Sequence, residues 1–395
     1  MKPRQTAEVD RLLLECDRQA ENPPNVDGVP DIYISMFAVA LKESLAVQPG
    51  AQEHFAHAVG VKKKAGPFPS SYAFNSLLRN SQKVLMFNAE NPEEYDVSYP
   101  YKTQEEWNER VGALVSDDET FRDITYNMFI WNVGSDVETR IAGPKLVAHT
   151  MQNERVNNPK DPFTILIIGS AADHSLVMLS QNIDIPEVRV IDRGLGKGKQ
   201  KFLQNLVHEL LAREVVIGEC HGVDVWPYKD SDWRYFLEAC RYYPSELLDL
   251  EKRDKFRMLE GKRSLDPRIK NITADYGVDE VVAPRKDMVI FPTSMYQNYQ
   301  EKRRHMFDRS RNEHIKAGGK IVVQDFCKIK GANKNKHPID QLEFLGPTSK
   351  PYTYGTFVFD TLKPKLGFQL FGYWNNGRCE ALKPGELLLN SISNY

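Results

Sequence analysis

Two hydrophobic spacings divide the chain. Before about residue 145, apolar residues recur every three or four positions, as in helices, over 32–47, 106–115 and 117–133. Farther along, short unbroken apolar runs are bounded by glycines, prolines and polar residues, a pattern typical of buried strands. The change of spacing predicts a mostly helical N-terminal domain over 1–145 and an α/β domain over 146–395.

The most informative apolar run ends in glycine. Residues 164–168 are Thr-Ile-Leu-Ile-Ile, the small residues Gly169, Ser170 and Ala171 follow, and a second apolar run some twenty residues later ends at Asp192. This order is typical of a nucleotide-binding βαβ unit, in which small residues let the backbone approach a ligand and the acid accepts hydrogen bonds from a ribose diol. We therefore expect Gly169, Ser170 and Ala171 to shape a cofactor loop and Asp192 to hold a ribose.

The same loop argues against a dinucleotide. Ala171 and His174 occupy positions where a G-x-G-x-x-G motif has glycines, so a pyrophosphate would find little bare backbone. S-adenosylmethionine (SAM) carries no phosphate and tolerates a looser loop. The chain resembles the class I SAM-dependent methyltransferases, which have a Rossmann-like fold.

The resemblance extends along the chain in the order of the family's strands. Runs at 271–276 and 287–294 resemble the third and fourth strands, and the run at 315–325 resembles the Gly-Gly turn and fifth strand. Runs at 354–360 and 367–374 resemble the antiparallel hairpin that closes the sheet. The resemblance implies a doubly wound, mostly parallel, seven-stranded sheet that binds SAM.

The resemblance also implies contacts of the cofactor beyond its loop. Asp275 with Tyr276, at the end of the third strand, is expected to meet the adenine. Thr293, at the end of the fourth strand, and Arg193, beside Asp192, are further candidates for cofactor contact.

Candidate catalytic residues are Tyr296, Asn298 and His174. Tyr296 and Asn298 follow the fourth strand, beyond whose carboxyl end ligands bind in open α/β sheets, and they can orient an acceptor by hydrogen bonds. His174 is the histidine nearest the cofactor loop in sequence and is a candidate base. A neighbouring serine, Ser294, is interpreted either as part of this edge or as the cap of the next helix.

An aromatic stretch over 126–132 favours a substrate lid in the N-terminal domain. Tyr126 and Trp131 are candidates for facing the sulfonium or the substrate, since an aromatic face attracts a cation, although packing also explains the stretch. A second departure from a simple fold is the long connection 212–270, which predicts a helical insertion that forms either a pocket wall or the interface of a homodimer.

Composition narrows the partners. With 395 residues, a formal net charge of −2 and a sequence pI of about 6.5, the chain lacks the basic balance of a nucleic-acid binder. The 5 cysteines are scattered and never in C-x-x-C spacing, so neither a disulfide framework nor a metal site is indicated. The sequence shows neither a signal core nor a membrane-length apolar run, and we expect a cytoplasmic enzyme with a small-molecule substrate.

Three functional alternatives stay open. The favoured function is methyl transfer from SAM to a small metabolite by in-line displacement, and the same site would also suit other SAM-dependent alkyl transfer or cyclisation. The loop 194–199, rich in glycine and lysine, with Arg193 before it, would suit an NADP-binding oxidoreductase. A non-catalytic Rossmann protein that serves as a binding partner is the third.

Overall fold

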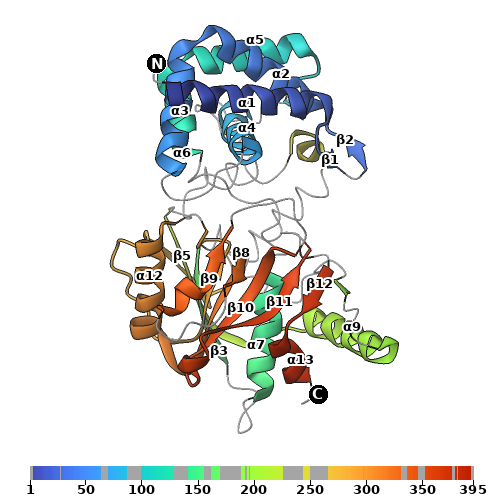
Figure 1. The fold of residues 1–395 in the computed structure, drawn as a ribbon, viewed down its shortest axis with the longest axis vertical. Coiled ribbons are helices and arrows are strands. Elements are labelled where there is room, and N and C mark those ends of the chain that lie inside the picture. The colour runs from blue at the N-terminus through green and yellow to red at the C-terminus, as the bar shows by residue number, and fades with distance from the viewer. Residues whose placement is uncertain are drawn as a thin grey trace. The chain divides into compact units, whose positions relative to one another are not determined.

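The chain folds into two compact units, one made of residues 1–135 with 229–258 and the other of 136–228 with 259–395 (Figure 1). The computed structural model describes residues 3–26, 28–63, 70–86, 99–128, 141–154, 162–169, 188–191, 194, 196–225, 243–249, 266–296, 298–330, 336–345, 352–375, 379 and 381–392.

The first unit is built from helices, as the hydrophobic spacing predicts, with a short β1–β2 pair. Its described elements are α1 (Pro3–Glu21), β1 (Asn25–Val26), β2 (Val29–Pro30), α2 (Ile32–Val47), α3 (Pro49–Lys63), α4 (Ser70–Met86), α5 (Gln104–Ser116) and α6 (Asp118–Asn127). Helix α2 begins where the Asp31 carboxylate accepts the backbone N–H groups of Tyr33 and Ile34. The rings of Phe37 and Trp107, 6.0 Å apart and edge-on, join α2 to α5 in the core.

The long connection expected as a helical insertion is divided between the units. Its 3₁₀ helix η2 (Pro244–Leu248) belongs to the helical unit, where Ser245 donates its backbone N–H and its hydroxyl to Asp31 at 3.1 and 2.7 Å. Residues 217–224 of the same connection instead form a strand in the second unit. The expected helical insertion over 212–270 therefore contains a strand, and its stretches 226–242 and 250–265 lie outside the described residues.

The second unit contains a ten-stranded mixed sheet. Its strands are β3 (Phe163–Ile168), β4 (Arg189–Val190), β5 (Ile217–Asp224), β6 (Ile269–Thr273), β7 (Lys286–Pro292), β8 (Ile315–Ile329), β9 (Leu342–Phe344), β10 (Tyr354–Asp360), β11 (Phe368–Trp374) and β12 (Ala381–Pro384). They lie in the order β4-β12-β11-β10-β8-β7-β3-β5-β6, and β9 pairs with β8. The predicted C-terminal hairpin is present as the antiparallel pair β10 and β11, whereas the expected count of seven strands is not confirmed.

Five of these strands make the doubly wound part of the sheet. Strands β3, β5, β6, β7 and β8 pair in parallel, and the chain runs outward from β3 through β5 to β6, then returns to β7 and β8 on the other side. In such a sheet the carboxyl ends of the two strands where the direction reverses form the usual ligand crevice. Here those strands are β3 and β7, which we call the switch point.

The run at 188–191 does not form the second strand of the βαβ unit. Strand β4 lies at the opposite edge of the sheet, where it pairs in parallel with β12. Five strands lie between it and β3, so six strand spacings of about 4.8 Å place β4 about 30 Å away. The parallel neighbour of β3 that the βαβ pattern requires is β5.

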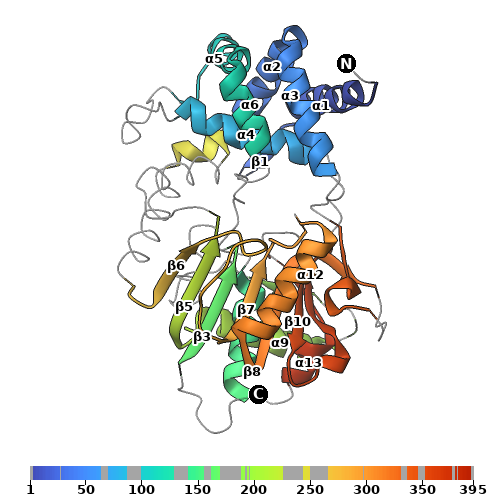
Figure 2. The same ribbon diagram turned by 90° about the vertical axis from the view of Figure 1, so that its left-hand side faces the viewer.

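Helices cover both faces of this sheet (Figures 1 and 2). On β3, Ile165 and Ile167 belong to the core cluster that includes side chains of α7 (Ala142–Glu154), α9 (Lys197–Ala212) and α13 (Glu386–Ile392), and Leu166 and Ile168 belong to the cluster that includes side chains of α12 (Gln300–Arg309). This alternation follows from the two-residue period of a strand, and each such buried side chain contributes roughly 1.5–3 kcal/mol. None of the helices in the described ranges is long and apolar enough to cross a membrane.

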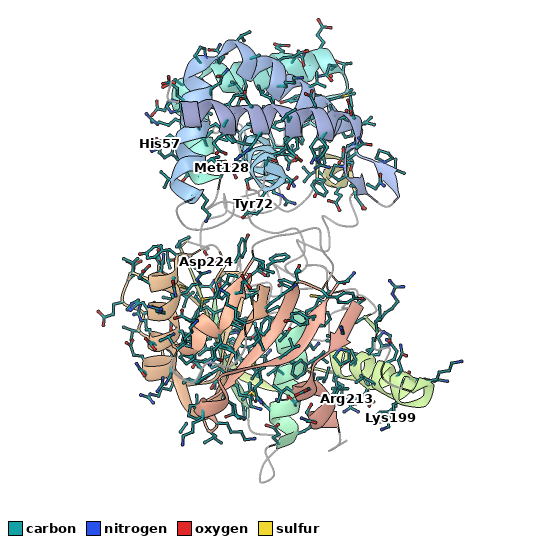
Figure 3. All side chains as sticks on the ribbon, in the orientation of Figure 1. His57, Tyr72, Met128, Lys199, Arg213 and Asp224 are labelled. Carbon is teal, nitrogen blue, oxygen red and sulfur yellow. The ribbon has the colours of Figure 1, made fainter. Side chains whose placement is uncertain are left out.

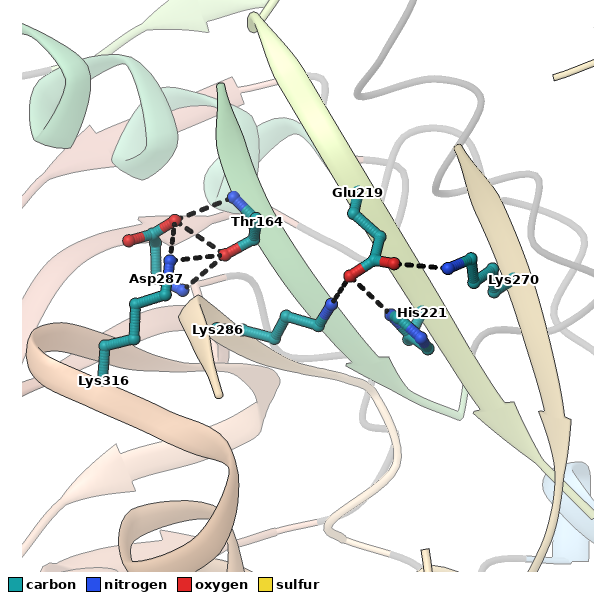
Figure 4. Close-up of polar contacts among 7 residues, drawn as sticks. All are labelled: Thr164, Glu219, His221, Lys270, Lys286, Asp287 and Lys316. Carbon is teal, nitrogen blue, oxygen red and sulfur yellow. Dashed lines mark hydrogen bonds and ion pairs between the residues drawn. The ribbon is translucent and has the colours of Figure 1, made fainter. Parts of the chain in front are cut away.

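Charged groups near the starts of the parallel strands are paired (Figure 4). The Glu219 carboxylate accepts from Lys270 at 2.6 Å and from the fully buried Lys286 at 2.5 Å. Next to them, the Asp287 carboxylate accepts from the backbone N–H and hydroxyl of Thr164. The two lysines hold the pKa of Glu219 down, at about 2, so the carboxylate is ionised at neutral pH.

Candidate functional site

Gly169 lies at the switch point, at the carboxyl end of β3. This residue follows β3 with φ +82°, its N–H donates to the Val223 carbonyl at 2.8 Å, and a Cβ in its place would lie 2.9 Å from Cβ of Ser294. Both the backbone conformation and the lack of space require glycine. The glycine that the sequence pattern singles out is thus the residue at which the ends of β3 and β7 come together.

The acid nearest Gly169 by strand pairing is Asp224. It ends β5, one residue after Val223, and its backbone carbonyl accepts the Ala274 N–H at 2.8 Å at the start of the turn after β6 (Figure 3). Its carboxylate accepts the N–H of Val225 at 2.7 Å. Sequence reasoning misses it because it predicts helices over 212–270, although the short run Gly222-Val223-Asp224 after a helix is itself a strand-end signal.

The acid that the sequence pattern favours, Asp192, follows β4 in the sequence, and β4 is the edge strand farthest from β6. The contact of Asp192 with a ribose stays a prediction. Asp192 and Arg193 lie outside the described residues, but Ile191, just before them, donates its N–H to Leu382 in β12. The described residues just before Asp192 therefore lie at the edge of the sheet that is far from Gly169. By strand order, the position expected for a ribose-binding acid is that of Asp224.

The turn after β7 begins with a strained residue. Thr293 has φ +57°, a conformation that is rare for a β-branched side chain and costs about 1–3 kcal/mol. Its N–H donates to the Gln324 carbonyl at 2.6 Å, and its hydroxyl lies 2.6 Å from that of Tyr354. The backbone N–H and the hydroxyl of Thr293 therefore contact residues of β8 and β10. These contacts lie at the edge of the sheet where the resemblance implies that a cofactor binds.

A buried carboxylate holds the rest of this turn. Oδ2 of Asp325 accepts the backbone N–H groups of Met295 and Tyr296, both at 2.9 Å, and its Oδ1 accepts the N–H of Phe326 at 2.7 Å. Asp325 is fully buried, and burial raises its pKa to about 7 against the lowering effect of these hydrogen bonds. We call residues 293–296, together with Asp325, the β7 turn.

The hydroxyl of Ser294 takes no part in the hydrogen bonds that hold this turn. Its oxygen is buried and finds no hydrogen-bond partner among the described residues. The next helix, α12, begins only at Gln300, with Tyr299 as its N-terminal cap, so Ser294 does not cap it. The interpretation of Ser294 as a helix cap is therefore wrong.

The structure places Tyr296 in the β7 turn and Asn298 in contact with it. The Tyr296 ring packs edge-on against Phe326 with centroids 5.9 Å apart. The Asn298 side-chain amide donates to the carbonyl of Ser294 at 2.8 Å. Asn298 thus supports the backbone of the β7 turn, and its contact with an acceptor stays a prediction.

Asp275 and Tyr276, the pair expected to contact the adenine, lie in different surroundings. Asp275 follows β6 and accepts Lys302 at 2.7 Å, at the same edge of the sheet as Asp224. The Tyr276 ring is buried, its hydroxyl lies 3.0 Å from Ser310 and 2.8 Å from Nδ1 of His314, and burial raises its pKa. Packing accounts for Tyr276, whereas Asp275 lies at the edge where the prediction placed it.

The remaining candidates lie in the first unit or outside the described residues. Tyr126 belongs to α6, is 45% exposed, and stacks on His57 with ring centroids 5.5 Å apart. The candidates outside the described ranges are Trp131, Ser170, Ala171 and His174. In the described part of the chain, no three His, Cys, Asp or Glu side chains converge as metal ligands would.

Comparisons with known proteins add no assignment. No protein-family model matches the sequence, and no curated protein matches it. The functional argument therefore depends on the geometry of the switch point.

Proposed function

We propose that the second unit is a SAM-dependent transferase that methylates a small molecule. The observation that carries the proposal is the pairing of Gly169 and Asp224: a left-handed glycine with no room for a side chain ends one central strand, and an acid ends its parallel neighbour. This is the arrangement in which a nucleoside ribose is held beside a closely approached backbone.

The residues of the switch point would divide the work of binding. Asp224 would accept hydrogen bonds from the ribose, and Asp275, one strand farther, would lie toward the adenine. SAM supplies an activated methyl group on its sulfonium, so the protein's task is to align the acceptor and exclude water. No strong base is required for an acceptor that is already nucleophilic. Tyr296, at the same edge, is the candidate for orienting the acceptor.

The test is calorimetric titration with SAM, S-adenosylhomocysteine and NADPH, on the wild type and a matched pair of variants. Asp224→Asn should weaken S-adenosylhomocysteine binding by about 1–3 kcal/mol, roughly 5- to 150-fold, because a buried ribose hydroxyl loses its acceptor. Asp192→Asn removes the same charge two residues after β4, the strand at the far edge of the sheet, and should leave the affinity unchanged. Equal losses in both variants, or binding of NADPH alone, would contradict the proposal.

Other SAM chemistry on the same fold is distinguished by the products. After incubation of the protein with SAM and no acceptor, mass analysis should show SAM unchanged if the reaction is methyl transfer to an external molecule. Loss of the aminocarboxypropyl group in that sample would instead identify cyclisation or a related self-reaction.

A further inference from the structure

Ser294 carries a polar group that the folded chain does not use. Its hydroxyl oxygen is buried without a partner among the described residues, although buried hydroxyls are nearly always hydrogen-bonded. The side chain lies against Gly169, where an added Cβ would be 3.5 Å from the Ser294 oxygen. An unsatisfied hydroxyl is thus placed against the glycine that follows β3, at the switch point of the sheet.

The surrounding turn holds this hydroxyl in place at a cost. Thr293, just before Ser294, has an unfavourable backbone conformation, and Asp325, which holds the turn, is a carboxylate buried away from water. Asp325 accepts the N–H groups of the two residues after Ser294. Strain and a buried acid concentrated in one short turn at a strand end are typical of a functional site, because packing alone would not select them.

Strand order indicates which end of a ligand the hydroxyl meets. Asp224 ends β5 and Asp275 follows β6, on one side of β3, whereas Ser294 follows β7, on the other side. A ligand whose nucleoside lies over β5 and β6 passes Gly169 and extends toward β7. The part that reaches Ser294 is therefore the part beyond the ribose.

We propose that the Ser294 hydroxyl is a ligand-binding group that hydrogen-bonds the amino-acid end of an adenosyl ligand, its carboxylate or its ammonium group. This inference rests on the proposed function. It assigns to the β7 turn the recognition of the charged, non-nucleoside end and leaves the ribose to Asp224.

The variant Ser294→Ala tests the proposal through two measurements with opposite directions. Because the hydroxyl is unpaired in the free protein, its removal should leave the urea midpoint of unfolding unchanged or raise it. The affinity for S-adenosylhomocysteine should fall about tenfold, the loss of one hydrogen bond to a charged group. The affinity for 5′-methylthioadenosine, which lacks the amino-acid end, should not change.

A second serine provides the matched control. Ser310 is also buried, but its hydroxyl donates to the Met306 carbonyl at 2.8 Å and lies 3.0 Å from that of Tyr276. Ser310→Ala should therefore lower the urea midpoint and leave the affinity for S-adenosylhomocysteine unchanged. The two variants remove the same atom and are expected to give opposite results in both measurements.

The outcomes separate this inference from the proposed function. If the wild type binds S-adenosylhomocysteine and Ser294→Ala binds it equally well, the role of Ser294 is refuted and the proposed function stands. A lowered urea midpoint in Ser294→Ala, or equal losses for S-adenosylhomocysteine and 5′-methylthioadenosine, would also refute it. If the wild type binds neither compound, both proposals fail.

Discussion

Replacing Asp325 with asparagine should change how stability depends on pH. The side chain is fully buried under the β7 turn, and burial raises its pKa from 3.8 to about 7. In the unfolded chain the carboxyl is ionised above about pH 4, whereas in the folded chain it keeps its proton until near pH 7. The folded state therefore binds more protons between these values, and stability falls as the pH rises through this window. Asparagine has a similar shape and does not titrate.

The size of the effect follows from the two pKa values. Each tenfold step in proton affinity corresponds to about 1.4 kcal/mol. Two such steps lie between about pH 5 and pH 7, so the wild type should lose about 2–3 kcal/mol relative to Asp325→Asn over that range. The quantity to measure is how the difference in the free energy of unfolding between the wild type and Asp325→Asn changes with pH. Imperfect hydrogen bonding of the amide adds a constant to this difference, which does not vary with pH.

The assay is urea unfolding at pH 5, 6, 7 and 8, with hydrogen exchange of the β8 amides used to report on the second unit alone. Asp340→Asn is the control, because Asp340 has a lowered pKa and its ion pair with Arg304 is already complete at pH 5. Its difference from the wild type should be constant from pH 5 to pH 8. A constant difference for Asp325→Asn as well, or one of opposite sign, would refute the reasoning.

Three further predictions concern stability and are checked by urea unfolding. Glu219→Gln should destabilise the fold by about 3–5 kcal/mol, because it leaves Lys286 buried without its counter-charge. Lys286→Met should lower the free energy of unfolding by less, because Glu219 is partly exposed and keeps Lys270. Equal losses of stability in the two variants would contradict this account. Gly143→Ala should destabilise by about 1–3 kcal/mol, because its Cβ would overlap the Thr356 hydroxyl under α7, and an unchanged midpoint would show that the sheet can yield there. His149, whose pKa burial lowers to about 4, is neutral in the fold, so its contribution is present above pH 6.5 and is lost as the pH falls toward 4; His149→Gln should reduce that loss by up to about 3 kcal/mol, and an undiminished acid loss would argue against it.

Local pattern was sufficient for the α/β class of the fold and for the glycine that follows β3. Helix α2 occupies the predicted range Ile32–Val47, and the C-terminal hairpin pairs as expected. The predicted Gly-Gly turn is present as an irregularity within β8, where pairing with β7 passes from Ile315 to Lys320. The sequence pattern singles out Gly169 because an apolar run followed by glycine is typical of the first strand and turn of a βαβ unit.

Only the tertiary structure decided which strands are neighbours. The run at 188–191 is short and apolar, whereas residues 217–224 include Glu219, His221 and Asp224 and are not typical of a buried strand, so the local pattern favours the wrong neighbour for β3. Pairing is set by how helices and strands far apart in the chain pack together, and here it placed Asp224 beside Gly169 and the strand before Asp192 about 30 Å away by the 4.8 Å strand spacing. The buried Ser294 hydroxyl, which has no hydrogen-bond partner among the described residues, is likewise a property of its surroundings, because the sequence does not show which serines folding buries or what lies beside them.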